Sequence, residues 1–306
     1  MDKNEKIINF GKQSGINTTG ELLDPRFDWC FKRIFTASEE QSKIALIDFL
    51  NSILFDGKDI IKDLTVLNNE MPVESYQQKK ARFDIRVIFQ NGEQALVEME
   101  LKAKDNFFKR SLHNISRMYS SQEISGKNFN SLKKCYMVGV MGQNLLGDDC
   151  DYINELTFKD KKGREYKDLS DMQIVYIELE KTAEFLEKPP EELTNAECWG
   201  IFLNYASYDD KREVLEKIAK KQRGIGMAVD VLNYISKDKL ERMKYEDALL
   251  AEIDYQSDLD DVAREADEKA RFEMAREMLL DGEPLNKIVK YTKLSAEEVE
   301  QLQKGK

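Results

Sequence analysis

Residues 81–102 read ARFDIRVIFQNGEQALVEMELK, and this stretch decides the fold. Apolar and polar side chains alternate before and after Asn91-Gly92, so each half has the two-residue period of a β-strand. The Asn-Gly dipeptide favours a tight turn between antiparallel strands. The stretch therefore predicts a β-hairpin with strands over residues 81–89 and 95–101.

Further helices and strands are predicted on both sides of this hairpin. Apolar residues at helical spacing predict helices over 27–35, 39–54 and 106–125, and apolar or β-branched runs predict strands over 60–67, 136–140 and 174–177. The run at 136–140 is expected in the centre of the sheet. A sheet of these strands, covered by helices on both faces, is a mixed α/β fold.

Lys188-Pro189-Pro190 marks the expected end of the α/β region, because the chain beyond it reads as almost entirely helical. We expect five segments, which are a loose polar arm over 1–20, the α/β domain over 21–188, a helical extension over 189–235, a charged helical linker over 236–268 and a small helix-turn-helix-like segment over 269–306. Glu297, Glu298 and Glu300 place charge that repels phosphate on the last helix. For this segment we therefore favour protein contact or homo-oligomer formation over DNA reading.

The composition excludes several kinds of chemistry. The 306 residues carry 47 Lys and Arg against 58 Asp and Glu, a net charge of −11, and contain one histidine, His113. A single histidine excludes sites built from histidine clusters, and the four cysteines, none in a Cys-x-x-Cys pair, do not make an ordinary zinc site. With no signal-peptide pattern and no apolar run of about 20 residues, we expect a cytoplasmic protein that does not enter a membrane.

Carboxylates mark the hairpin as the candidate site. Strand pairing brings Asp84 close to Glu98, and Glu100 and Lys102 follow at two-residue intervals on the same strand face. Hard divalent cations such as Mg²⁺ or Mn²⁺ bind carboxylate oxygens, and hydrolysis of a phosphodiester needs a metal, a positioned water and a nearby cation. We therefore expect Asp84 and Glu98 to bind the metal, with Glu100 or Lys102 positioning the water. The alternative is an ordinary solvent-exposed sheet face.

Positive charge gathers around this hairpin. Residues 79–134 carry twelve Lys and Arg against six acids, a net +6, whereas the rest of the chain carries −17. The polar residues of the predicted helix over 106–125 fall on one basic face, which suits phosphate groups unless it is simply solvated. We expect DNA to bind a set of basic residues, namely Lys79, Lys80, Arg82, Arg110 and Arg117.

A series of motifs runs along the chain. They are Asp28-Trp29-Cys30-Phe31-Lys32-Arg33-Ile34-Phe35, Asp48-Phe49-Leu50-Asn51, Phe83-Asp84-Ile85, Val97-Glu98-Met99-Glu100 and Ala275-Arg276-Glu277-Met278. Their order and spacing resemble the PD-(D/E)xK nuclease family transposases, also called recombination-promoting nucleases, over residues 20 to 306. The resemblance implies a restriction-endonuclease-like αβα core, Mg²⁺-dependent DNA cleavage and a role in recombination and mobile elements.

Matched to this family by position, Asp84 and Glu98 are implied to be metal ligands, and Asp28 matches the family's first-helix acid. From its place on that helix, Asp28 either supports the metal site from the side or is an N-terminal acid favoured by the helix dipole. Glu100 departs from the pattern, because the family usually has Gln there and the wider superfamily has Lys. Either Lys102 restores the missing cation, or the site is slow or inactive. Two hypotheses follow: a metal-dependent DNA endonuclease acting in recombination or transposition, and a catalytically impaired DNA-binding, regulatory or scaffold protein with the same fold.

Overall fold

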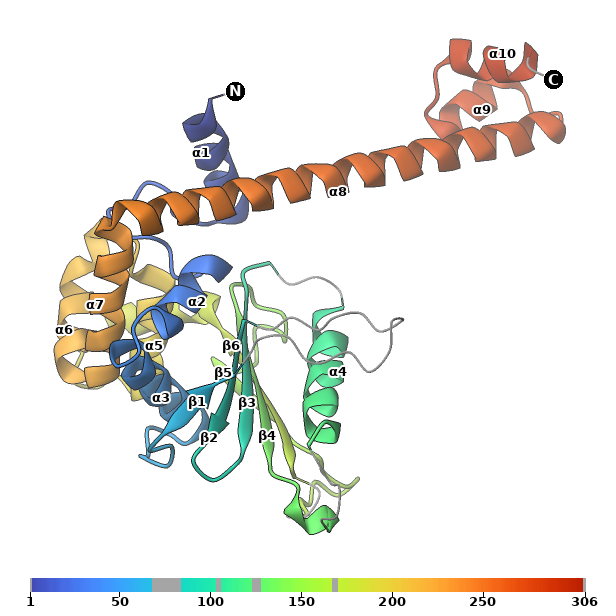
Figure 1. Ribbon diagram of the computed structural model, residues 1–306. Helices are drawn as coiled ribbons and strands as arrows, with labels where there is room; N and C mark the ends of the chain where they lie inside the picture. The colour runs from blue at the N-terminus through green and yellow to red at the C-terminus, as the bar shows by residue number, and fades with distance from the viewer. Residues whose placement is uncertain (1, 68–83, 103–105, 123–127, 167–169, 305–306) are drawn as a thin grey trace. The chain divides into compact units, whose positions relative to one another are not determined.

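The computed structural model describes residues 2–67, 84–102, 106–122, 128–166 and 170–304. The chain divides into two compact units, Met1–Glu246 and Asp247–Lys306. The first unit contains a six-stranded sheet in the order β1-β2-β3-β4-β6-β5 (Figure 1). Its strands are β1 (Leu64–Val66), β2 (Ile85–Phe89), β3 (Gln94–Glu100), β4 (Cys135–Met141), β5 (Ile153–Leu156) and β6 (Met172–Glu178).

The sheet is mixed, as the sequence predicts. β1, β2 and β3 are antiparallel neighbours, β4 pairs in parallel with β3 and β6, and β5 returns antiparallel along β6. β4 is fully buried between two partners, which confirms that residues 136–140 form a central strand. β5 is a strand that the sequence analysis did not predict.

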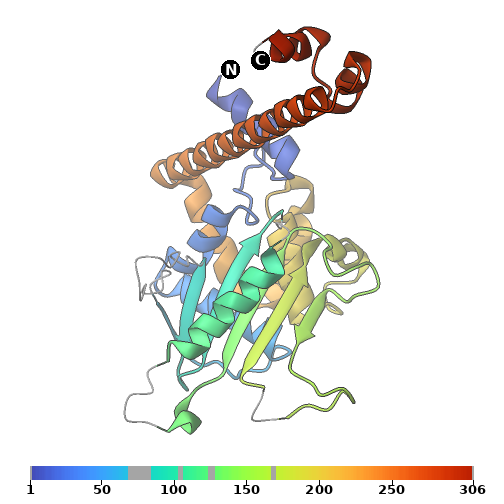
Figure 2. The same cartoon turned by 90° about the vertical axis from the view of Figure 1, so that its right-hand side faces the viewer.

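Helices cover both faces of the sheet, so the αβα arrangement is confirmed. Helix α4 (Phe107–Ser120) lies across one face, as Figure 2 shows, where Ile115 and Met118 pack on Leu96 and Met137. Helices α2 (Asp28–Thr36) and α3 (Gln41–Leu54) lie on the other face (Figure 1).

Residues 1–20 differ from the expected loose arm. Lys3–Ser14 form helix α1, which buries Ile7 and Gly11. The helix ends at Gly15, whose φ of 82° is a left-handed conformation that glycine adopts without steric cost. Gly11 lies close to Ile16 and Thr18, so the segment after the helix folds back against it.

Three helices beyond the proline pair belong to the first unit. They are α5 (Asn195–Tyr205), α6 (Arg212–Lys221) and α7 (Arg223–Lys237). α7 packs along α3, and Gly224 lies so close to Asp48 that a Cβ atom there would be 2.2 Å from the aspartate Cβ. The side chain of Asp48 accepts hydrogen bonds from Trp199 and Gln222. Burial of α3 by these helices makes them part of the same compact unit as the sheet.

The start of α5 carries a capping box that provides a test of its contribution to stability. Thr194 Oγ1 accepts from the Glu197 amide at 3.2 Å, and the Glu197 carboxylate accepts from the Thr194 amide at 2.7 Å. We expect Thr194→Ala to lower the free energy of unfolding by about 1 kcal/mol, because it removes the hydroxyl that satisfies a helix N–H group. Urea unfolding measures this change. Thr194→Ser keeps the hydroxyl and is the control, and an equal loss in both variants would contradict the capping role.

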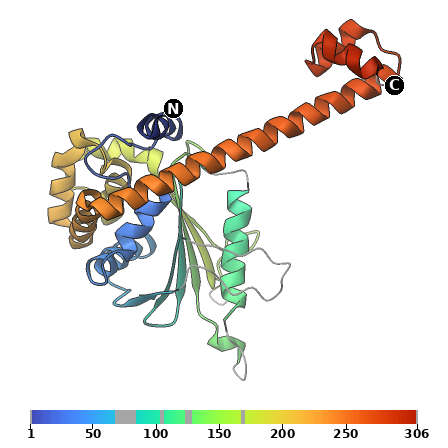
Figure 3. The same cartoon turned by 45° about the horizontal axis from the view of Figure 1, so that its top comes forward.

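The second unit contains the end of a long helix and two short helices. Helix α8 (Lys239–Leu280) begins in the first unit and continues unbroken to Leu280, as Figure 3 shows. The Asp281-Gly282 turn, α9 (Leu285–Thr292) and α10 (Ala296–Lys304) follow as predicted. Ala275, Ile288, Leu294 and Val299 form their small core. Ser295 and Glu298 form a capping box at the start of α10 through reciprocal hydrogen bonds, and oligomer formation stays a prediction.

All four cysteines are free thiols, and three of them are buried. Within the described ranges, no helix is long and apolar enough to cross a membrane.

Candidate active site

The hairpin brings Asp84 and Glu98 to the same end of the sheet. Ile85 of β2 pairs with Val97 of β3, so continuing this antiparallel register by one residue places Asp84 opposite Glu98. The Met99 amide donates a hydrogen bond of 2.7 Å to Asp84 Oδ2, which fixes the aspartate against β3. Both side chains are largely buried, with 16% of Asp84 and 7% of Glu98 exposed.

Helix α2 supplies a cation to this pair. The Lys32 ammonium lies 3.1 Å from Asp84 Oδ1 and 2.7 Å from Asp28 Oδ2. Asp28 and Lys32 are one helical turn apart, so their side chains lie on one face of α2. Lys32 therefore bridges two of the three residues that the sequence analysis assigned to the metal.

Helix α4 supplies the neighbours of Glu98. The Asn114 side-chain amide donates to Glu98 Oε1 at 3.0 Å, and the Arg110 guanidinium lies 3.8 Å from Glu98 Oε2. Arg110 also forms an ion pair with Glu100. Gly139 of β4 allows α4 to pack close to the sheet, because a Cβ atom at that position would lie 3.1 Å from Phe107 of α4.

The two carboxylates are in an environment that disfavours their negative charge. Burial, reinforced by the charge of Asp28, raises the pKa of Asp84 well above its usual value, although Lys32 opposes the shift. Burial also raises the pKa of Glu98, against the opposing effects of Arg110 and Asn114. Burial acts to lower the pKa of Lys32, but the carboxylates of Asp84 and Asp28 outweigh it, so that this pKa is raised. A divalent cation is the kind of ligand that stabilises such a carboxylate pair.

Lys102 does not lie on the face that carries Glu98 and Glu100. β3 ends at Glu100, and the chain bends at Leu101 and Lys102, where Leu101 packs closely against Gly142. The two-residue alternation ends with the strand, so the Lys102 ammonium donates instead to the backbone carbonyl of Gln13 at the end of α1. The expectation that Lys102 continues this strand face is wrong.

The residues expected to bind DNA have different positions in the structure. Lys79, Lys80 and Arg82 lie outside the described residues. Arg110 is held by Glu100 beside Glu98, and Arg117 is a partly exposed residue of α4.

Two site residues were missed by sequence reasoning, namely Lys32 and Asn114. Lys32 has a local signal, since an acid and a lysine four residues apart form a helical ion pair. Asn114 was read only as part of a basic helix face, but it is 5% exposed and donates to Glu98. Its position depends on how α4 packs on the sheet, which no local pattern reveals.

The family model of the PD-(D/E)XK nuclease family transposase matches residues 25–262 of the chain. The chain belongs to this family. The mixed sheet of the structure is consistent with the PD-(D/E)XK nuclease fold, and membership of the family supports a nuclease related to transposition. Comparisons with curated proteins and with solved structures give no match.

The family match covers the carboxylates and the residues around them. It includes β3, α2, α4 and Asp84 directly before β2, and so covers every residue of the site, whereas α1 precedes it. In the stretch Glu98-Met99-Glu100, glutamate stands where the motif that names the family has lysine. The structure brings two other cations, Lys32 and Arg110, to the carboxylates.

The donor set fits a hard divalent cation held by few protein ligands. Within the described part of the chain, no three His, Cys, Asp or Glu side chains converge as a ready metal cage. Mg²⁺ needs no such cage, because it keeps several water ligands and uses one or two carboxylates. Asp84 and Glu98 provide that pair, and Asp28 reaches Asp84 through Lys32.

Proposed function

We propose that this protein is a Mg²⁺- or Mn²⁺-dependent DNA endonuclease that hydrolyses phosphodiester bonds in recombination or transposition. The observation that carries the proposal is the pair formed by Asp84 and Glu98. The two carboxylates are largely buried, lie opposite each other, with Glu98 on β3 and Asp84 directly before β2, and have raised pKa values. Membership of a nuclease family supports DNA as the substrate, and the free thiols support action in the reducing cytoplasm.

In this proposal, Asp84 and Glu98 hold the metal. A bound divalent cation would polarise the phosphate and lower the pKa of an attacking water. The Met99 amide fixes Asp84, and Asn114 fixes Glu98, so both carboxylates are oriented before substrate binds. Such orientation saves reorganisation during the reaction.

Glu100 has an indirect role in this proposal. It holds the Arg110 guanidinium beside Glu98. A guanidinium there would contact a nonbridging phosphate oxygen and stabilise the charge that develops during hydrolysis. Arg110 would thus supply the cation that Glu100 itself does not, and Lys102 is not needed to position the water.

Removal of the metal tests the proposal directly. We expect nicking of supercoiled plasmid in Mg²⁺ or Mn²⁺, complete loss of nicking in excess EDTA, and recovery when excess Mg²⁺ is restored, because the hydrolytic water needs the cation. Gel electrophoresis of the plasmid measures the outcome. Nicking that persists unchanged in EDTA would refute metal dependence.

The regulatory alternative has its own observation, which is the glutamate in place of the motif's lysine. Salt-sensitive DNA binding without any nicking, unchanged by EDTA, would favour this alternative.

A further inference from the structure

A polar cavity of about 460 Å³ lies next to the candidate active site, at the carboxyl ends of β3 and β4. Leu101 and Lys102 follow β3, and Gly142 and Gln143 follow β4. The Gly142 amide donates a hydrogen bond of 3.0 Å to the carbonyl of Glu100, so this wall of the cavity begins where β3 ends. Lys102 lies four positions after Glu98, so their Cα atoms are at most about 14 Å apart. In α/β sheets, the carboxyl ends of strands are where ligands bind.

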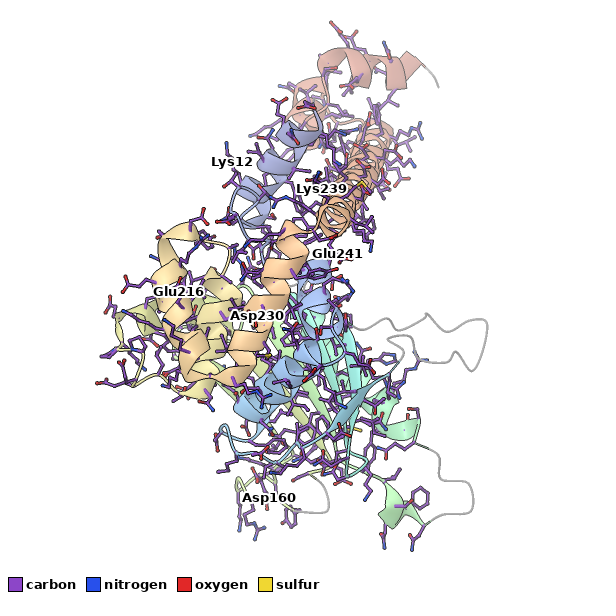
Figure 4. The ribbon with its side chains drawn as sticks, turned by 60° about the vertical axis from the view of Figure 1, so that its left-hand side comes forward. Lys12, Asp160, Glu216, Asp230, Lys239 and Glu241 are labelled. Carbon is purple, nitrogen blue, oxygen red and sulfur yellow. The ribbon has the colours of Figure 1, made fainter. Side chains whose placement is uncertain are left out.

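The opposite wall comes from α1 and from the end of α5. α1 contributes Lys12, which Figure 4 labels on this helix, together with Gln13. Because the family match begins at residue 25, the part of this wall that α1 contributes lies outside the matched region. Tyr205 and Tyr208 line the cavity from the end of α5 and the segment that follows it.

A network around Arg26 connects the end of α1 to the end of α5 within this second wall, and Lys102 reaches across to the carbonyl of Gln13. The guanidinium forms a 2.6 Å ion pair with the fully buried Asp24 and donates to the Gly15 carbonyl at the end of α1 and to Asn204 of α5. It also donates to the Tyr208 hydroxyl. The cavity is therefore built by fixed polar contacts between segments that are distant in sequence.

The lining combines positive charge with aromatic rings. Lys12, Arg26 and Lys102 contribute cations, against one carboxylate from Glu180. The rings of Tyr205 and Tyr208 are partly exposed, with centroids 6.3 Å apart. Lysines beside aromatic rings are the combination that binds the phosphates and bases of single-stranded nucleic acid.

We propose that this cavity holds one unpaired nucleotide of the DNA strand that is cut. Lys12 and Lys102 contact its phosphate, and its base lies against Tyr205. The proposal rests on the proposed nuclease function and names its substrate as DNA with an unpaired end or flap. A volume of about 460 Å³ suits a single small ligand and excludes a duplex. An unpaired base also avoids the free energy needed to unstack a paired one.

Fluorescence anisotropy with the full chain in EDTA tests this inference without cleavage. The probes are a labelled blunt hairpin duplex and the same duplex with a short unpaired end, each over a range of salt concentrations. We expect about tenfold tighter binding of the unpaired end. Lys12→Gln and Lys102→Gln should each weaken its binding and reduce the slope of log K against log salt by about 0.7, the value for one phosphate contact on a single strand.

Matched variants separate these contacts from general effects on charge or folding. Lys161→Gln removes an exposed lysine from the loop between β5 and β6, at the other end of the sheet, and should change neither affinity nor slope. Tyr205→Leu should abolish the preference for the unpaired end, while Tyr205→Phe should retain it. Thermal unfolding of each variant verifies that it is folded.

Equal binding of both probes by the wild type, or cavity variants that behave like Lys161→Gln, would overturn the inference. These failures differ from a failure of the proposed function. A wild type that prefers the unpaired end but never nicks DNA supports the proposed cavity and refutes the proposed nuclease function. A wild type that nicks DNA without preferring the unpaired end supports the nuclease function and refutes the proposed role of the cavity.

Discussion

Replacing Asp84 with asparagine is expected to lower plasmid nicking by about a hundredfold to a thousandfold. The change leaves an amide where the proposed site needs a carboxylate oxygen for the metal, and loss of a single stabilising group in such a site costs on the order of 10²–10³ in rate. Quantitative nicking assays at saturating Mg²⁺ measure the effect. Isothermal calorimetry with Mg²⁺ should show a parallel loss of metal affinity.

Asp84→Asn should remain folded, which makes the activity loss interpretable. Because the folded pKa of Asp84 is raised, its ionised form is disfavoured, and this penalty on stability grows as the pH rises above the ordinary aspartate range. A neutral amide removes the penalty and can still accept the hydrogen bond from Met99. We therefore expect no fall in unfolding temperature at neutral pH.

Two exposed acids on the outer helices provide matched controls. Asp230 on α7 and Glu216 on α6, both labelled in Figure 4, are exposed. Asp230→Asn should nick DNA like the wild type, as should Glu216→Gln, whereas Glu98→Gln should resemble Asp84→Asn. The same trace activity in Asp84→Asn and in the wild type would rule out the enzyme hypothesis.

Trp199→Ala is expected to lower the free energy of unfolding by about 3–5 kcal/mol, the range for removing a buried large aromatic side chain. Trp199 is fully buried, and its ring lies 5.3 Å from that of Phe49 and 5.6 Å from that of Phe202, measured between centroids. Its indole nitrogen donates to Asp48 at 2.7 Å. The alanine variant therefore leaves a cavity and removes a donor from a carboxylate that lies between α3 and α7.

Urea unfolding of Trp199→Ala and Trp199→Phe separates the contribution of packing from that of the indole hydrogen bond. Trp199→Phe keeps most of the packing but removes the indole N–H, so a smaller loss of about 1–3 kcal/mol is expected from the unpaired acceptor and the lost volume. Trp29→Ala is the matched control, because Trp29 is only partly buried and makes an edge contact with Tyr245 at 5.8 Å. Equal losses in Trp199→Ala and Trp29→Ala would contradict the central role of Trp199 in the core.

The sequence predicts the carboxylate pair well, because the interactions that place it are local. Alternation around Asn91-Gly92 defines the hairpin register, and this register places Asp84 opposite Glu98 without knowledge of the rest of the fold. The central position of β4 is predictable for a similar reason, since its apolar run can only be buried on both faces.

The rest of the site depends on long-range packing. Lys32 reaches Asp84 only because α2 packs beside the strand ends, and Asn114 reaches Glu98 only because α4 lies close to the sheet. Lys102 leaves its predicted face because β3 ends at Glu100, and strand ends are poorly defined by alternation alone. The helix at Lys3–Ser14 is stabilised by tertiary contacts that a polar sequence does not reveal.

The ammonium of Lys32 also affects when the protein becomes able to act. A buried carboxylate without a counter-charge opposes folding. Proteins that rely on a bound metal to neutralise such carboxylates fold only when the metal is present. Here an ammonium group 3.1 Å from Asp84 provides the counter-charge within the chain itself. In the proposed nuclease, folding therefore precedes loading with metal, and the supply of free divalent cation, not the survival of the fold, determines when DNA is cut.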